Sequence, residues 1–167
     1  MHTGNFDEAL DKIVAKDTRF TRDAYLFVRE SLDYTQKMMV KATREKEARE
    51  SRESAAISAS AANPTEGEEK PNHVSGQELL SGIRALALEQ FGPMTITVLE
   101  EWGVRRCEDF GEIVFNMVDN NLLAKTSEDS REDFKGGYDF DQAFRQPFLP
   151  VSPKKPAEQP EAKPSKV

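Results

Sequence analysis

The sequence is poor in the residues that support disulfide or metal chemistry. Among 167 residues it has one cysteine, Cys107, and two histidines, His2 and His73. A single cysteine excludes an internal disulfide. These three side chains are also far apart in the sequence and lack the spacing of metal ligands. We therefore expect no disulfide framework, no metal site and no cofactor.

Long apolar runs and glycine-rich loops are also missing. No apolar run reaches transmembrane length, and no basic start with an apolar centre marks a secretory signal. No phosphate-binding loop or dinucleotide fingerprint is present. Together with the unpaired cysteine, these absences predict a cytoplasmic protein that has no membrane partner. They also leave an enzyme without positive support.

Charge is what the sequence has in abundance. Charged residues make up 32% of the chain and hydrophobic residues 37%, so we expect part of it to stay unfolded. The net charge is −7, and residues 74–145 alone, with 7 basic and 14 acidic residues, account for a deficit of that size. An acidic segment repels phosphate, which disfavours nucleic acid as a partner.

Hydrophobic spacing divides the chain into four parts. Residues 1–40 hold two amphipathic stretches and predict a helical hairpin that packs against the second module. Residues 41–73 indicate a charged extension of the second helix and then an Ala/Ser-rich, Pro/Glu-rich flexible linker. Residues 74–146 are expected to form the main module. Residues 147–167, rich in Pro, Lys and Glu, predict a disordered tail.

The most regular pattern lies in residues 106–126, which we expect to organise the module. Apolar residues recur there at helical spacing: Phe110, Ile113, Val114, Met117 and Val118. This spacing predicts a helix with one apolar face. The Asn120-Asn121 pair is expected to end it, because asparagine tolerates the left-handed conformation. Leu122 and Leu123 then predict extended chain.

Two further helices are expected before this one. Ser75 and Glu78 have the spacing of a capping box ahead of a broad apolar run. Gly92 and Gly103 are suited to end the first and the second of these helices. Three helices separated by short turns have the size of a helix-turn-helix core.

The segment after the third helix is expected to supply a wing. Gly136 and Gly137 lie between aromatic residues, which predicts a turn or bulge in a small β-hairpin. Residues 139–144 fit a single helical turn equally well. The predicted fold is therefore mainly α with a small β part (α+β): an N-terminal helical hairpin plus a winged-helix-like three-helix module with a small β-hairpin.

Three blocks of sequence carry a resemblance to a known family. The first is F-D-E-A-L-D-K-I-V with D-A-Y-L-F-V-R-E-S-L-D-Y-T, and the second is H-V-S-G-Q-E-L-L-S-G-I-R with A-L-E-Q-F-G-P-M. The third is V-L-E-E-W-G-V-R-R-C-E-D-F-G-E-I-V-F-N-M-V with S-R-E-D-F-K-G-G-Y-D-F and Q-A-F-R. The chain resembles a family of conserved hypothetical proteins of planctomycetes and verrucomicrobia over residues 6–150, the linker excepted. The resemblance implies no activity, cofactor or catalytic residue.

The composition favours a non-catalytic protein-interaction module with a protein partner. The polar side of the predicted third helix is acidic, and a winged helix of that sign more often contacts protein than DNA. This interpretation is an analogy from fold. The expected interaction surface consists of Glu108, Asp109, Glu112, Asn116 and Asp119.

Two alternatives remain open. The first is a DNA-associated transcriptional regulator of winged-helix type that contacts nucleic acid through Arg105, Arg106 and Lys125. The second is an enzyme that uses Cys107 or the acidic loop near Asp129. Cys107 follows two arginines at a helix start, where a thiol pKa can be lowered. The acidic loop lacks the alternating ligands and central glycine of a calcium loop.

Overall fold

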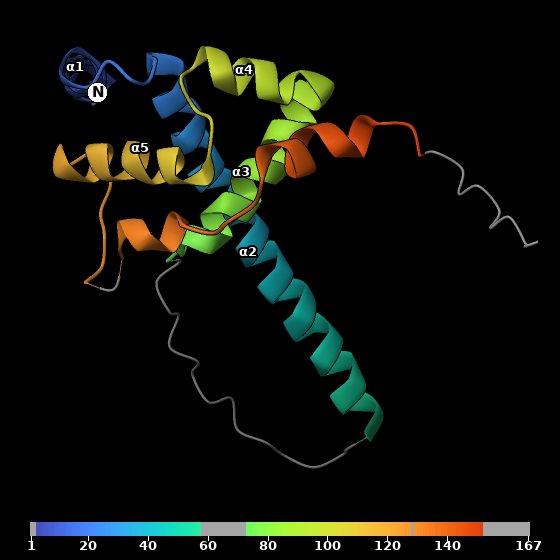
Figure 1. Cartoon of the computed structure of the whole chain (residues 1–167). Coiled ribbons are helices and arrows are strands. Elements are labelled where there is room, and N and C mark those ends of the chain that lie inside the picture. The colour runs from blue at the N-terminus through green and yellow to red at the C-terminus, as the bar shows by residue number, and fades with distance from the viewer. Residues whose placement is uncertain (1–2, 58–72, 128, 152–167) are drawn as a thin grey trace, which may run out of the picture.

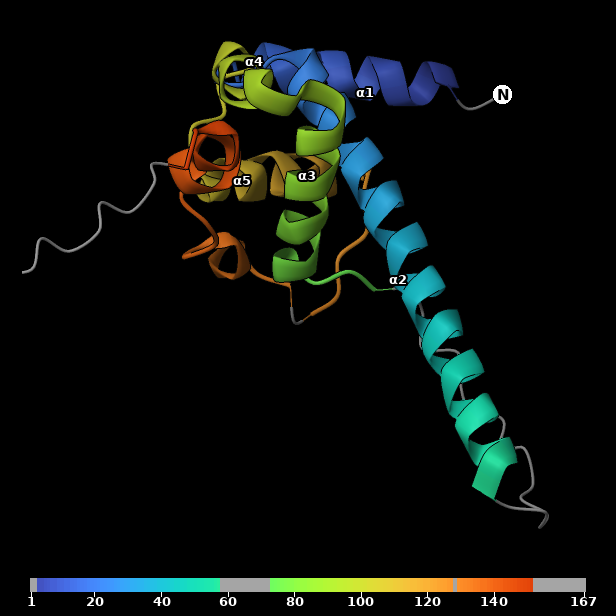
Figure 2. The same cartoon turned by 90° about the vertical axis from the view of Figure 1, so that its right-hand side faces the viewer.

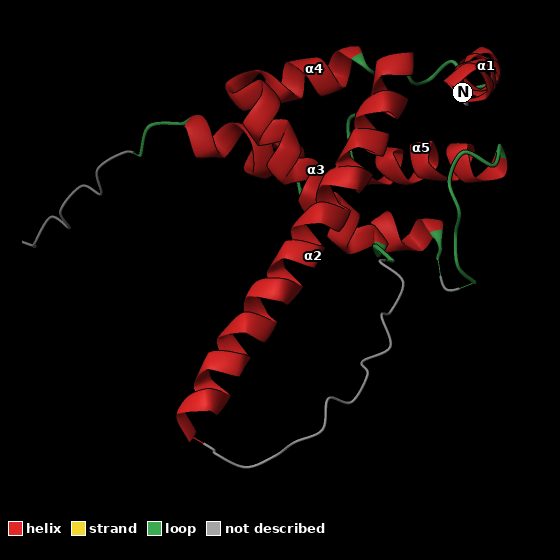
Figure 3. Cartoon of the chain, turned by 180° about the vertical axis from the view of Figure 1, so that it is seen from behind, coloured by secondary structure: helices red, strands yellow, loops and turns green. Residues whose placement is uncertain are grey.

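Five α-helices and four short helical turns make up the described part of the chain, which comprises residues 3–57, 73–127 and 129–151 of the computed structural model. The helices are α1 (Thr3–Lys16), α2 (Arg22–Ile57), α3 (Gly76–Phe91), α4 (Thr95–Glu101) and α5 (Cys107–Asp119). The turns are η1 (Gly92–Met94), η2 (Arg131–Phe134), η3 (Asp141–Arg145) and η4 (Gln146–Phe148). The prediction of a mainly α protein is confirmed, and Figure 3 shows helices and loops over these residues.

The long helix α2 has two unlike halves. Residues 22–40, which we call the embedded half, include the buried side chains Tyr25, Val28 and Ser31. Every residue from 41 to 56, the free half, is exposed. Figures 1 and 2 show this half extending well beyond the other helices. The predicted charged extension of the second helix is confirmed, and it continues as helix to Ile57.

The core forms where the embedded half of α2 crosses α3 and both pack against α5. The crossing is close at Gly82 of α3, where a Cβ atom would lie 1.7 Å from Thr35 Oγ1 of α2. One hydrophobic cluster contains fully buried residues of the N-terminal helices and of the later ones, among them Leu10, Tyr25, Ile83, Leu99 and Ile113. The N-terminal helices and residues 74–146 therefore share a single core.

The predicted helix ends are confirmed at α3 and α5. Ser75 caps α3: its side chain accepts from the Glu78 N–H, and the Glu78 carboxylate accepts from the Ser75 N–H. After α5, Asn121 has a φ of 58°, the left-handed conformation expected of it. The Leu122 N–H then donates to the Met117 carbonyl at 2.8 Å, which satisfies one of the last carbonyls of the helix.

The β-hairpin prediction is wrong, and without a wing the winged-helix prediction is not supported. The described residues contain no β-strand. Leu122 and Leu123 use their N–H groups to close the end of α5. Gly137 has a steric role: a Cβ atom there would lie 2.8 Å from Cys107 Sγ and 2.9 Å from Leu80 Cδ1. Because residue 137 is a glycine, the backbone can pass this close. Residues 136–140, which we call the strap, therefore cross over α3 and α5.

The strap ends in the helical turn that was the alternative expectation. Residues 141–145 form η3, a turn of π-helix, and Phe140, Ala143 and Phe144 are buried. Tyr138 packs edge-on against Phe144, and its hydroxyl donates to the Leu80 carbonyl at 3.0 Å. Aromatic packing, with ring centres about 5–6 Å apart, holds the strap against the core, and strand pairing is not involved.

The sequence predicts a flexible linker and a disordered tail. Most of the linker, residues 58–72, lies outside the described residues, and so do residues 152–167 of the tail. The beginning of the tail is described and includes η4. Within the described ranges, no helix combines the length and the hydropathy needed to cross a membrane.

Candidate interaction cleft

A cleft of about 310 Å³ lies between the embedded half of α2, the start of α3, the second half of α5 and the loop from α5 to η2. The apolar side chains that line it include six that we call the floor: Leu32, Leu79, Val114, Phe115, Val118 and Phe134. The volume lies at the lower end of the range for small-ligand sites, about 300–1,000 Å³. The cleft is therefore suited to a few apolar side chains or a small apolar ligand.

The predicted apolar stripe of α5 explains why the cleft is apolar. Phe110, Ile113 and Met117 point into the core and are at most 1% exposed. Val114 and Val118 each follow a core position by one residue, so they lie about 100° further around the helix. Both are half-buried and line the cleft. The apolar stripe of α5 is therefore wider than the part of the helix that the core covers. Its edge, Val114 and Val118, is left to line the cleft.

A hydrogen bond crosses the rim of the cleft. His73 Nε2 lies 2.9 Å from Asp129 Oδ1. The second carboxylate oxygen of Asp129 accepts from the Thr126 N–H at 2.7 Å. Asp129 therefore ties the segment that leads into α3 to the loop that follows α5, and both of its oxygens are occupied. No sequence pattern predicts this contact, because His73 and Asp129 are 56 residues apart in the chain.

Two cations lie over the ring of Phe115. The Arg131 guanidinium carbon is 4.8 Å from the ring centre, and Lys125 Nζ is 5.5 Å from it. Cations at such distances are attracted to the negative face of an aromatic ring. Lys125 thus marks the edge of the cleft, and Arg131 extends from there toward the acidic side of α5.

The acidic residues of α5 are mostly held by contacts within the chain. The two oxygens of Glu112 lie 3.5 Å from Arg19 and 3.5 Å from Arg131, and Asp119 lies 3.7 Å from Arg131. Asp109 accepts from the backbone N–H groups of Arg105 and Arg106 and so caps the helix. Of the predicted interaction residues these contacts engage Asp109, Glu112 and Asp119, and Glu108 is half-buried.

Asn116, the fifth of these residues, joins a hydrogen-bonded group that includes Asp17. Its side-chain amide donates to Asp17 Oδ2 at 2.9 Å and to the Tyr25 hydroxyl at 3.0 Å. Arg19 donates to both oxygens of Asp17, and these bonds hold the pKa of the Asp17 carboxyl well below its ordinary value, although burial opposes them. Burial raises the pKa of the Tyr25 hydroxyl. This group joins α5 to the start of α2.

The predicted nucleic-acid contacts do not form one patch. Arg105 and Arg106 are exposed just before the first turn of α5. Lys125 lies over Phe115, eight residues into that helix, about 12 Å along its axis at 1.5 Å per residue. Glu112 and Asp119 lie on the same helix, and residues 74–145 remain strongly acidic. The arrangement does not favour a phosphate-binding face.

Cys107 does not have the predicted environment of a reactive thiol. It is 2% exposed, and its sulfur lies 3.3–3.4 Å from the backbone oxygen and nitrogen of Tyr138. Burial raises the pKa of the Cys107 thiol, with a further increase from Glu108 and Asp109. The lowered pKa on which the enzyme alternative depends is not found, because burial and the two neighbouring carboxylates act in the opposite direction. No cluster of three potential metal ligands occurs among the described residues.

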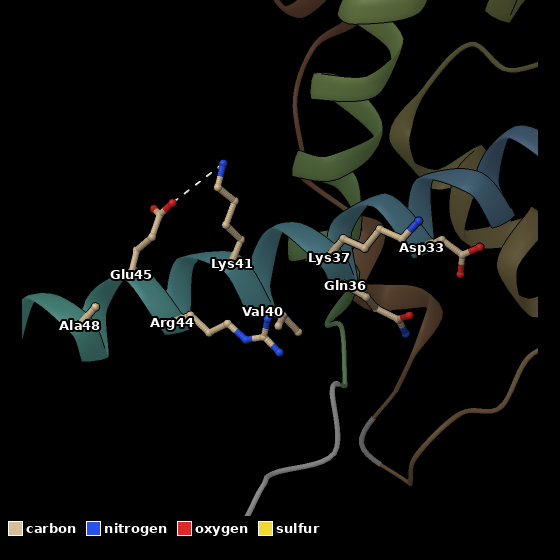
Figure 4. A pocket seen from close by; sticks show the side chains of 8 residues that line it. All are labelled: Asp33, Gln36, Lys37, Val40, Lys41, Arg44, Glu45 and Ala48. Atoms are coloured by element: carbon tan, nitrogen blue, oxygen red, sulfur yellow. Dashed lines mark ion pairs between the residues drawn. The ribbon is translucent and has the colours of Figure 1, made fainter.

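A second hollow lies along α2, from Asp33 to Ala48 (Figure 4). All of the described residues that line it belong to this one helix, and they include Lys37, Lys41 and Arg44. Figure 4 shows Lys41 paired with Glu45 along the helix surface. A single helix cannot enclose a ligand, so the cleft beside α5 is the better candidate site.

No protein-family model, no curated protein and no solved structure matches the chain. The resemblance to planctomycete and verrucomicrobial proteins stays a prediction from the sequence. Any functional assignment must therefore come from the geometry of this chain.

Proposed function

We propose that the chain is a non-catalytic protein-interaction module, and that its cleft receives apolar side chains of a protein partner. The observation that carries the proposal is the apolar floor of the cleft, which is open at the surface and framed by charged groups. Binding energy at protein interfaces concentrates where an anchor side chain fills such a pocket inside a polar rim.

The location of the proposed contact differs from the sequence-based expectation. The acidic side of α5 is largely used by the chain itself, since Glu112 and Asn116 bind Arg19, Arg131, Asp17 and Tyr25. A partner that bound there would first have to displace these contacts. The cleft needs no such displacement, because its half-buried valines have no further cover within the described chain.

The rim of the cleft also favours binding over catalysis. His73 is the only histidine of the described residues, and its Nε2 is bound to Asp129. Both serines that line the cleft are engaged as caps: Ser75 Oγ accepts from the Glu78 N–H and Ser130 Oγ from the Glu132 N–H. Among the described residues neither hydroxyl donates to His73 or to a carboxylate, as the hydroxyl of an activated nucleophile would.

The test is a pull-down with the tagged full chain from its native host, with and without nuclease. Val118→Glu places a carboxylate in the cleft floor, where an apolar anchor would have to desolvate it. Val40→Glu is the matched control, because Val40 is also a half-buried valine of a helix but lines the second hollow along α2 and not the cleft. We expect a nuclease-resistant partner that Val118→Glu loses and Val40→Glu keeps, with both variants folded by circular dichroism.

Capture that Val118→Glu leaves unchanged would contradict the proposal. Recovery of nucleic acid, with partners lost on nuclease treatment, would favour the DNA-associated regulator. In that case substitution of Arg105, Arg106 and Lys125 should abolish the recovery. The proposed compartment is the cytoplasm, and cell fractionation tests it.

A further inference from the structure

The end of the described chain carries an unusual concentration of exposed apolar side chains. Phe148 is 45% exposed, Leu149 53% and Val151 94%, and they make up half of the large hydrophobic residues that are exposed in the described chain. The other three, Leu26, Met38 and Met94, are far apart in the sequence. Three such side chains within four residues indicate a binding segment.

The backbone of this segment is a short helical turn, η4, that becomes extended at Leu149. Pro147 and Pro150 flank the exposed pair, and Leu149 has φ −77° and ψ 143°, close to polyproline II. Proline fixes φ, so the segment loses little conformational entropy when it binds. Phe144, four residues before Phe148, is fully buried and anchors the start of the segment.

The segment cannot fill the cleft of its own chain in the observed fold. Figure 1 shows η4, in orange-red, leaving the molecule on the right, whereas the loop between α5 and η2 lies on the left. The two surfaces are therefore on opposite sides of α3. An apolar cleft and an apolar segment on one chain, separated in this way, can meet only between two copies.

We propose that the cleft of one copy binds residues 146–151 of a second copy, in a head-to-tail contact. This inference rests on the proposed function of the cleft as a docking site. The floor valines Val114 and Val118 receive Phe148 and Leu149 of the other copy. Because donor and acceptor are different surfaces, the contact is heterologous and builds chains or closed rings.

Charge complementarity supports a second copy as the occupant. The segment itself is uncharged, but Arg145 precedes it and Lys154 and Lys155 follow it. Residues 146–167 contain four lysines and two glutamates, whereas the module that forms the cleft is strongly acidic. The charged side chains that line the rim are Asp129, Asp133 and Lys125, and His73 lies beside Asp129. The overall attraction is between a basic tail and an acidic module.

The test is sedimentation velocity on the full chain over a wide concentration range, with two complementary variants. Phe148→Ser with Leu149→Ser removes the donor, and Val118→Glu blocks the acceptor. We expect the average mass of the native chain to rise above 18.8 kDa with concentration, and each variant alone to stay at that monomer mass. Met94→Ser is the control, because Met94 is similarly exposed but belongs to neither surface.

Mixing the two variants gives the sharper result. The donor-deficient chain keeps its cleft and the acceptor-deficient chain keeps its segment, so the mixture should form a dimer that grows no further. A synthetic peptide of residues 145–155 should dissociate the native oligomer. A native chain that stays monomeric, variants that still associate alone, or a mixture that does not associate would each overturn the inference.

The outcomes also separate this inference from the proposed function. A monomeric native chain together with loss of partner capture in Val118→Glu would reject the second copy as occupant and keep the cleft as a docking site. Capture that Val118→Glu does not change would reject the docking site itself.

Discussion

The two halves of α2 have the same secondary structure and different physical causes for it. The embedded half carries aromatic and large aliphatic residues at helical spacing, and Tyr25 and Val28 have 0% exposure. The free half carries alanines and opposite charges four residues apart, as in Lys41–Glu45, Lys46–Glu50 and Arg49–Glu53. Packing stabilises the first half, and local pairs stabilise the second.

This difference shows that a long helix need not be packed against the core along its whole length. Whether a given turn is buried depends on the side chains of that turn and not on the continuity of the helix. In this chain the cover ends near Val40, where large apolar residues give way to alternating charge. The free half is thus a surface element, and the cleft lies beside the embedded half.

Substitution by proline should have the largest effect on stability and should distinguish the two halves of α2 most clearly. Proline in a helix interior costs about 3 kcal/mol or more. Ser31→Pro strikes a fully buried position and should lower the melting temperature by about 10 °C, from roughly 2–4 °C per kcal/mol in a domain of this size. Ala48→Pro should remove helical signal and leave the melting temperature nearly unchanged. Thermal melts followed by circular dichroism check both variants, and equal losses would refute the division.

The close crossing of α2 and α3 gives the next largest effect. Gly82→Ala places a Cβ atom 1.7 Å from Thr35 Oγ1 and 2.9 Å from Thr35 Cβ. We expect a loss of about 1–3 kcal/mol in the free energy of unfolding, as for other overpacked cores. Thr35→Ala in the same chain removes the closer of these two contacts and should restore part of the loss.

Denaturant titrations of the four chains of this double-mutant cycle measure the coupling. Ala48→Val adds apolar atoms to an exposed position of the free half and serves as the control, with an expected change within about 0.5 kcal/mol. A Gly82→Ala chain as stable as the native chain would show that the helices are further apart than described.

The Asp17 group should make the embedded side sensitive to acid. The pKa of the Asp17 carboxyl lies below its ordinary value of 3.8, so its charged form stabilises the fold at neutral pH. This contribution is complete above about pH 5 and decreases as the pH falls below 3.8 toward the lower folded-state pKa. Asp17→Asn should therefore cost about 1–3 kcal/mol at pH 7, where charge-assisted hydrogen bonds are lost.

The cost should become smaller as the pH is lowered, because the Asp17 carboxyl then binds a proton in the unfolded chain while it stays charged in the folded chain. Urea titrations of both chains between pH 7 and pH 3 measure it. Asp33→Asn is the control, since Asp33 is exposed and has no ion pair within the described residues. If the cost of Asp17→Asn did not change with pH, the Asp17 side chain would stabilise the fold through its packing and hydrogen-bond geometry and not through its charge.

The smallest effect is expected from the ion pairs of the free half. Glu50→Gln breaks the exposed pair with Lys46 and should cost about 0.2–0.5 kcal/mol of local helix stability, screened by salt. Hydrogen exchange of the amides in residues 41–56 should become faster at low salt, with no change in the core. Glu47→Gln is the control, because Glu47 makes no ion pair within the described chain. Faster exchange in α3 would show that the halves are coupled.

The sequence predicted the helices well because their signals are local. Ser75 and Glu78 cap α3 as their spacing indicated, and Asn121 ends α5 in the left-handed conformation. The glycine pair at residues 136–137 led to the wrong prediction of a β-hairpin, because glycine occurs both in hairpin turns and where two backbone segments approach closely. Only the positions of Leu80 and Cys107 decide which of these two roles applies at Gly137.

The candidate site was harder to predict than the fold. The polar side of α5 was expected to face a partner, but the turn between α1 and α2 places Arg19 and Asp17 against it. Cys107 was considered as a reactive thiol from its neighbours in sequence, and the strap at Tyr138 buries it. In each case the deciding group is distant in the chain, and periodicity does not report on distant groups.

The sequence by itself determined where the helices lie, how they end and that the second half of α2 carries no apolar face, since these follow from spacing, capping and local charge. The tertiary structure alone decided that Val114 and Val118 line a cleft, that His73 meets Asp129, and that Glu112 is shared by two arginines. The physical reason is that local energies depend on neighbours within about one helical turn. Whether a surface is buried depends instead on which distant segments the folded core places beside it.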